Sequence, residues 1–218
     1  MAGRIIICPR CNERIEEKLK IVKPKLLIVE GRDEEEFFEA FLENLKIGDV
    51  QVAGVGGKTK IRSNLKTLKT TDPYFAQVTS LGIVRDADED HRAAFTAVQD
   101  ALKAASLPCP KKQLVSTKTL PKVTVMILPP GASHGSLEDI CLGSVKDDPA
   151  MSCVDDYFGC LETKGIDRPV KDFVKAKARV FLSSREDPTL ALGIAAKKGC
   201  WPFGAAGFDS VKEFLRSL

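Results

Sequence analysis

The chain has 218 residues, of which 44% are hydrophobic and 29% charged, and its formal net charge is +3. These values are typical of a globular protein with one α/β domain, and they exclude a fibrous or disordered chain. No apolar run reaches the roughly 20 residues of a membrane span, and no apolar signal-peptide segment opens the chain. We therefore expect a cytoplasmic protein without membrane association. A net charge this small neither indicates nor excludes a nucleic-acid partner.

The leader at residues 1–24 carries Cys8 and Cys11 in the pattern CPRC, followed by NERIEEKLK, which favours a helix. A structural zinc site needs four ligands and no second CxxC follows, so we do not expect zinc at this pair. Thioredoxin-type redox motifs have the same spacing, but a leader of this length cannot form that domain. The seven cysteines are irregularly spaced, and we expect reduced thiols rather than a disulfide framework.

From Lys25 onward, strand and helix patterns alternate. We expect strands at 25–30, 50–55, 78–85 and 122–128, with helices at 34–46, 58–69, 90–105 and from about 137. This order predicts a Rossmann-like parallel sheet of about four strands with right-handed crossovers. Only helical patterns follow Asp147, at 149–163, 170–183, 188–198 and 209–218. We therefore expect an α/β core at 25–145 and a C-terminal helical extension at 146–218 that packs on it.

Two of the expected strands end abruptly in carboxylates. Glu30 precedes Gly31 after one strand, and Asp86 and Asp88 follow another. An acid at the carboxyl end of a parallel strand lies at the ligand-binding edge of the sheet. Carboxylates gathered there without basic partners repel one another unless a cation joins them, and oxygen ligands favour Mg²⁺ or Mn²⁺. We expect Glu30, Asp86 and Asp88 to hold such an ion.

The acids that follow have simpler explanations in part. Asp33 and Glu36 fit a capping box at the start of a helix. Capping likewise explains Asp139, three residues after Ser136. Glu138 is open between a first-turn acid and a ligand of a second metal.

A glycine-rich turn precedes a basic helix. Its last residues resemble a Walker A loop, but Val52 stands where the first glycine is required, which argues against a P-loop nucleotide hydrolase. Glycines before a helix N-terminus still form a good anion site. The basic side chains face either solvent or a phosphate backbone. The candidate residues for phosphate or nucleic-acid binding are Gly56, Gly57, Lys58, Lys60 and Arg62.

Lys177 falls within the apolar stripe of the helix expected at 170–183. A lysine in such a stripe ordinarily extends its ammonium group to the surface. The alternative is a lysine that reaches the acidic edge and stabilises charge on a phosphate.

These motifs resemble the Toprim domain superfamily, the metal-binding module of topoisomerases, bacterial-type primases, small RNA-maturing nucleases and overcoming-lysogenization-defect (OLD) nucleases. Glu30-Gly31 and Asp86-Ala87-Asp88 match its Glu-then-DxD order, and the resemblance covers about residues 25–145. The segment Leu137-Glu138-Asp139 and a later lysine resemble additions of the OLD type. The whole chain is similar to small stand-alone Toprim-like proteins.

The resemblance implies a Toprim fold, with Mg²⁺ at Glu30, Asp86 and Asp88, Glu138 and Asp139 at a second metal, and Lys177 as an electrostatic helper. It implies a metal-dependent nuclease acting on DNA or RNA, in which Glu30 and Lys177 take part in catalysis. The alternative is a non-catalytic Toprim-fold module that binds nucleic acid or nucleotide. We expect neither the further domains of a primase nor the ATPase domain of an OLD nuclease in this chain, so that activity would need a partner protein or a homodimer, or would have been lost.

Overall fold

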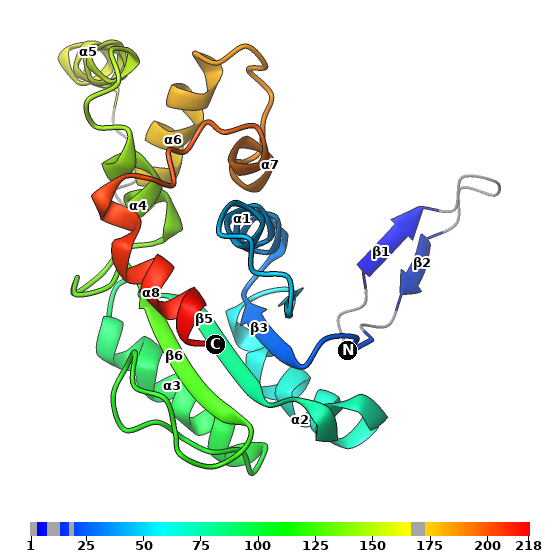
Figure 1. The fold of residues 1–218 in the computed structure, drawn as a ribbon. Coiled ribbons are helices and arrows are strands. Elements are labelled where there is room, and N and C mark those ends of the chain that lie inside the picture. Colours follow the sequence, from blue (N-terminus) through cyan, green and yellow to red (C-terminus); the bar gives the residue numbers. More distant parts are fainter. Residues whose placement is uncertain (1–3, 8–13, 18–19, 167–172) are drawn as a thin grey trace.

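A computed structural model gives the fold of the chain except for residues 1–3, 8–13, 18–19 and 167–172, and of residues 4–7 and 14–17 it describes the backbone alone. The elements stack in layers around one central sheet, with the helices within residues 150–197 at the top of the view in Figure 1 and the C-terminal helix against the sheet. No helix in the described part of the chain is long and apolar enough to cross a membrane.

The central sheet has four parallel strands in the order β4-β3-β5-β6, which confirms the expected α/β fold. Its strands are β3 (Lys25–Val29), β4 (Val50–Gly54), β5 (Ser80–Asp86) and β6 (Lys122–Leu128). The runs are apolar at nearly every position because helices cover both faces of a parallel sheet. Alternate residues of β3 divide between the faces: Leu26 and Ile28 join one apolar cluster, and Leu27 and Val29 join the other.

One face is covered by two helices that follow strands, α2 (Ile61–Thr71) and α3 (His91–Ala104). A short turn of 3₁₀ helix, η1 (Lys58–Lys60), leads into α2, and a second, η2 (Pro73–Gln77), follows it. Leu65 and Leu68 of α2 pack with Val98 and Leu102 of α3 in this cluster. The 3.6-residue spacing of these apolar side chains is the reason both segments are helical.

The other face carries α1 (Arg32–Asn44) together with the C-terminal helices (Figure 1). These helices are α4 (Leu137–Ser144), α5 (Ala150–Thr163), α6 (Phe173–Ser183), α7 (Leu192–Lys197), η4 (Ala206–Phe208) and α8 (Asp209–Ser217). Phe41 of α1 stacks on Phe203 with ring centroids 4.1 Å apart. Close approach needs a glycine at Gly193 of α7, where an added Cβ would collide with the backbone oxygen of Asp33. The extension therefore shares one apolar core with α1.

The helix expected after CPRC is wrong. β2 (Arg14–Glu17) instead pairs antiparallel with β1 (Arg4–Ile7) in a separate two-stranded sheet. A helix this short is marginal by itself, whereas the preceding strand offers its backbone a ladder of hydrogen bonds. Cys8 and Cys11 lie outside the described residues.

Candidate functional site

Glu30 directly follows β3 and Asp86 ends the neighbouring parallel strand β5, so both acids lie at the carboxyl edge of the sheet. The Glu30 side chain is 16% exposed, and its Oε1 atom is buried without a hydrogen-bond partner among the described residues. Asp86 is 8% exposed. Two carboxylates withdrawn from water at one edge are costly when both are charged, since burial and like charge act in the same direction.

Arg85 is the basic neighbour of Glu30. Its Nε lies 3.5 Å from Glu30 Oε1, close enough for an ion pair but too long for a good hydrogen bond. Arg85 Nε is itself buried without a hydrogen-bond partner in the described structure. Desolvation raises the pKa of Glu30 to about 7; Arg85 opposes that rise, and the charges of Asp88 and Glu34 add to it. Glu30 therefore changes charge near neutral pH.

Asp86 faces the start of α4. The Leu137 backbone N–H donates to Asp86 Oδ1 at 3.0 Å. Burial, and then the charges of Glu30, Glu34 and Glu138, raise the pKa of Asp86 well above its usual range, while Lys175 lowers it. The first turn of α4 thus brings Glu138 into the same electrostatic group as the two strand-end acids.

Asp88 is more open than Asp86 and has its own basic partner. The Lys58 ammonium donates to Asp88 Oδ2 at 2.6 Å. The expectation that these carboxylates gather without basic partners is therefore wrong, because Arg85 stands beside Glu30 and Lys58 beside Asp88. Sequence patterns missed both pairs, since each joins segments that only the tertiary fold brings together.

Glu34 is a further acid of this edge that sequence patterns missed. The expected capping box is wrong: Gly31 precedes α1 without a side-chain cap, and Glu36 accepts from Arg32 Nε at 2.9 Å. Because α1 begins at Arg32, Glu34 lies in its first turn. Burial and the charges of Glu138 and Asp33 raise the pKa of Glu34. The expected helix began at residue 34, two residues too late. A start at Arg32 would have placed Glu34 in the first turn, facing the edge.

The glycine-rich loop after β4 folds onto the end of β3. The Gly57 N–H donates to the backbone oxygen of Glu30 at 2.7 Å, and the Val55 N–H donates to that of Val29 at 3.0 Å. Gly56 and Gly57 have φ values of 76° and 114°, which L side chains rarely adopt. These bonds bring Lys58 to the acidic edge.

Two more basic candidates follow Lys58. Lys60 ends η1, Arg62 lies in the first turn of α2, and both residues are exposed.

Two other candidates have partners in the structure. Asp139 Oδ2 accepts from the Ser136 backbone N–H at 2.8 Å, which is the capping role that its position predicts. The Lys177 ammonium lies 2.6 Å from Asp155 Oδ1 of α5. Lys175, two positions before Lys177, is the α6 lysine whose charge acts on Asp86.

No three His, Cys, Asp or Glu side chains in the described part of the chain lie in an arrangement ready to hold a metal ion.

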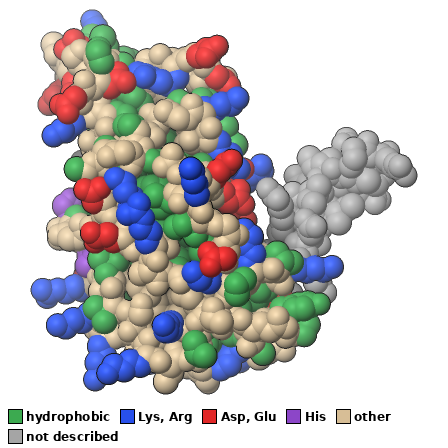
Figure 2. Space-filling model, in the orientation of Figure 1, with side chains coloured by type: hydrophobic (Ala, Val, Ile, Leu, Met, Phe, Trp, Pro, Cys, Tyr) green, Lys and Arg blue, Asp and Glu red, His purple; other side chains and the backbone are tan. Residues whose placement is uncertain are grey.

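Acidic side chains also gather away from this edge, in the upper part of Figure 2 over the C-terminal helices, whereas the lower part is mostly basic and apolar.

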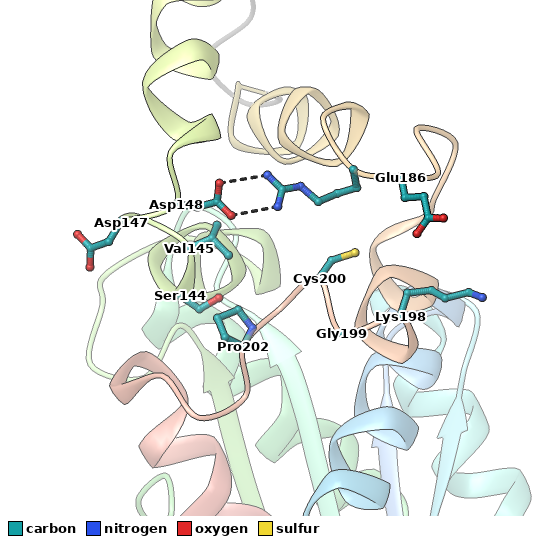
Figure 3. A pocket seen from close by; sticks show the side chains of 10 residues that line it. Ser144, Val145, Asp147, Asp148, Glu186, Lys198, Gly199, Cys200 and Pro202 are labelled. Carbon is teal, nitrogen blue, oxygen red and sulfur yellow. Dashed lines mark hydrogen bonds and ion pairs between the residues drawn. The ribbon is translucent and has the colours of Figure 1, made fainter.

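A separate hollow of about 490 Å³ lies among the C-terminal helices (Figure 3). Across it, Arg185 donates to both oxygens of Asp148, at 3.0 and 3.1 Å, and this pairing lowers the pKa of Asp148. The guanidinium carbon also lies 4.3 Å from the centre of the Phe181 ring. The pair ties the start of α5 to the end of α6, and its polar groups are satisfied.

A sequence model of the family DUF3226, described as "Protein of unknown function", matches residues 24–218. The chain belongs to the DUF3226 family. No curated protein matches this chain.

Solved structures similar to this DUF3226 chain include a hypothetical protein from Pyrococcus horikoshii OT3, with 16% identity, a TM-score of 0.54, and coverage of 90% of this chain and 95% of that one. The C-terminal region of the Burkholderia pseudomallei OLD protein has 13% identity and a TM-score of 0.50, covering 90% and 97%. At these identities the likeness shows a shared fold.

Proposed function

We propose that this chain is a Mg²⁺- or Mn²⁺-dependent protein that acts on the phosphodiester backbone of nucleic acid, as a Toprim-type nuclease. The single observation that carries the proposal is the buried, unsatisfied Oε1 of Glu30, which lies at a sheet edge shared with Asp86. Buried polar atoms in proteins are nearly always satisfied, and exceptions concentrate where a ligand or ion belongs.

The donor set fits a hard divalent cation. Glu30, Asp86 and Asp88 supply carboxylate oxygens, and Glu34 and Glu138 add two more acids close enough to shift the pKa values of the first group. Mg²⁺ and Mn²⁺ prefer such ligands. Because Lys58 pairs with Asp88, cation binding there requires the lysine side chain to rotate away, and we assign Glu30, Asp86 and Asp88 as the first ligands.

The remaining acids divide between two tasks. Glu34 and Glu138 are our candidates for a second cation, and Asp139 contributes by holding the start of α4 through Ser136. Bound at this edge, Mg²⁺ supplies Lewis-acid stabilisation of the charge that develops on a phosphodiester.

Basic residues on two sides of the edge suit a phosphate backbone. Gly56, Gly57, Lys58, Lys60 and Arg62 lead into the N-terminus of α2, where backbone N–H groups and the helix dipole favour anions. On the other side, Lys175 is better placed than Lys177 to act on a bound phosphate, because its charge reaches Asp86. Lys177 serves this role only if it leaves Asp155.

A nuclease has two further supports. The Glu-then-DxD order resembles that of Toprim enzymes, and one similar structure is the C-terminal region of the Burkholderia pseudomallei OLD protein, which we propose as a relative in chemistry as well as in fold. The alternative function is that of a non-catalytic module that binds nucleic acid or nucleotide, by itself, with a partner protein or as a homodimer. Arg85 and Lys58 favour this alternative, since they neutralise two of the acids without metal.

Cleavage tests the proposal directly. Supercoiled plasmid, single-stranded DNA and structured RNA are each incubated with the protein and Mg²⁺ or Mn²⁺. We expect the wild type to cut at least one substrate, Glu30→Gln to lose that activity, and Glu43→Gln, on an exposed position of α1, to retain it. Equal cleavage by wild type and Glu30→Gln would reject the site, and cation binding without cleavage would favour the binding module.

A further inference from the structure

We infer that Lys58 is a stand-in cation: its ammonium group neutralises Asp88 while no divalent ion is bound, and moves to a phosphate of the nucleic acid when an ion binds. This inference rests on the proposed function, and it adds a regulatory step to that site. Lys58 would then couple two events, cation binding at the acidic edge and phosphate binding at the start of α2.

The contact itself is short and accessible. Lys58 Nζ lies 2.6 Å from Asp88 Oδ2, and the two side chains are 45% and 39% exposed. A pair this exposed is held weakly, because water competes for both charges, and it shifts a competing equilibrium by a factor of about five at most. A divalent ion with further carboxylate ligands nearby can therefore displace the lysine.

The two partners differ in how firmly the backbone holds them. Asp88 exchanges two hydrogen bonds of 2.9 Å with Gly135, so its position is fixed against the segment before α4. Its φ of 53° is a left-handed conformation that this bridge maintains. Lys58 instead follows two glycines and carries its charge on a long flexible side chain. Displacement therefore moves the lysine and leaves Asp88 in place.

The basic start of η1 and α2 lies beside Lys58, and the released ammonium group moves to a phosphate bound there. Lys58 begins η1, and neither η1 nor α2 has an acid in its first turn, whereas Lys60 and Arg62 are basic and exposed. A phosphate at this helix start meets positive charge from side chains and helix dipole together. Once freed from Asp88, Lys58 adds one more positive charge to that surface.

Arg85 does not act in the same way. It faces Glu30 with side chains only 14% and 16% exposed, and its Nη1 also donates to the backbone oxygen of Ala94 at 3.4 Å. Arg85 is therefore confined within the fold, whereas Lys58 is free to exchange.

We therefore predict reciprocal coupling through Lys58: divalent cation strengthens nucleic-acid binding, and nucleic acid strengthens cation binding by the same factor.

Calorimetric titration with Mn²⁺ alone tests the competition, independently of cleavage. Lys58→Met removes the stand-in, and Lys60→Met removes one equal charge two positions away, from a side chain that forms no ion pair in the described structure. We expect Lys58→Met to bind Mn²⁺ roughly two- to fivefold more tightly than Lys60→Met, the range that an exposed ion pair can supply. Matching thermal unfolding curves establish that both variants are folded.

Anisotropy of a fluorescein-labelled single-stranded oligonucleotide then measures the coupling, in EDTA and in Ca²⁺. Wild type and Lys60→Met should bind the oligonucleotide more tightly in Ca²⁺, and Lys58→Met should lose most of that gain. Equal Mn²⁺ affinity in the two variants, or an undiminished Ca²⁺ gain in Lys58→Met, overturns the stand-in role and leaves the cation site intact. Absence of Mn²⁺ binding by the wild type overturns the proposed function as well.

Discussion

Two arginine–acid pairs in the described part of the chain, Arg185–Asp148 and Arg85–Glu30, differ in geometry and in the pKa of their acid. At the C-terminal helices, Arg185 donates to both oxygens of Asp148, at 3.0 and 3.1 Å, and the pKa of Asp148 is lowered. At the strand edge, Arg85 lies 3.5 Å from Glu30, each leaves an atom unsatisfied, and the pKa of Glu30 is raised to about 7.

The two acids differ in the hydrogen bonds, the burial and the neighbouring charges that the rest of the structure gives them. Asp148 also accepts from the Ala150 N–H at 2.9 Å and stays partly open to water, so its charge is stabilised. Burial and the charges of Asp88 and Glu34 raise the pKa of Glu30, and the guanidinium of Arg85 does not offset that rise. The satisfied pair ties the start of α5 to the end of α6, whereas the unsatisfied pair lies at the edge where we propose that a divalent cation binds.

The largest expected effect separates the two pairs by activity. Provided that the chain cleaves nucleic acid, Asp86→Asn should lower cleavage at least about 100-fold, because even groups outside a metal's direct ligands cost roughly 10- to 100-fold. Asp148→Asn should leave the rate within about twofold, since this acid lies at a separate hollow. Initial rates at saturating Mn²⁺ measure both. Comparable losses in the two variants would mean that unfolding, and not loss of a ligand, explains them.

Stabilisation by cation is the next effect in size. Mn²⁺ at about 100 times its Kd should add about 2.7 kcal/mol to the free energy of unfolding, because the ion binds only the folded chain. Thermal unfolding with and without Mn²⁺ should show this increase in wild type and in Asp148→Asn, but not in Glu30→Gln. A shift of equal size in Glu30→Gln would place the ion elsewhere.

The edge acids could be predicted from sequence because the pattern that places them is local. A buried apolar run that ends in a carboxylate puts Glu30 and Asp86 at the same edge once the strands are parallel. The basic partners of Glu30 and Asp88 could not be predicted from sequence. Arg85 is a strand residue without a local signal, and Lys58 meets Asp88 only through tertiary structure. Glu34 was missed for a narrower reason, an error of two residues in where α1 begins.

The dependence of stability on pH should have opposite signs in the two pairs, and Glu30 should make the larger contribution. Its pKa rises from 4.5 to about 7 on folding, so the folded chain binds more protons and loses stability as pH increases through that interval. In EDTA at pH 8, Glu30→Gln should therefore be more stable than wild type by about 2 kcal/mol, allowing for partial solvation. Urea unfolding should show this difference shrinking toward pH 4.5; a pH-independent difference would point to altered packing instead.

The smallest effect is the loss of the satisfied pair. The pKa of Asp148 is lowered by Arg185, so its stabilising contribution is present above the ordinary carboxyl pKa and disappears as pH falls through the lowered value. Asp148→Asn should reduce the free energy of unfolding at pH 7 by about 1 kcal/mol, because both side chains are partly exposed. Urea unfolding in a series of buffers from pH 7 downward should show the full loss at pH 7 and a progressively smaller one as the pH falls below the ordinary carboxyl pKa. Destabilisation that instead grew toward low pH would contradict the contrast between the pairs, since it would mean that Asp148, like Glu30, is more stable in the fold when protonated.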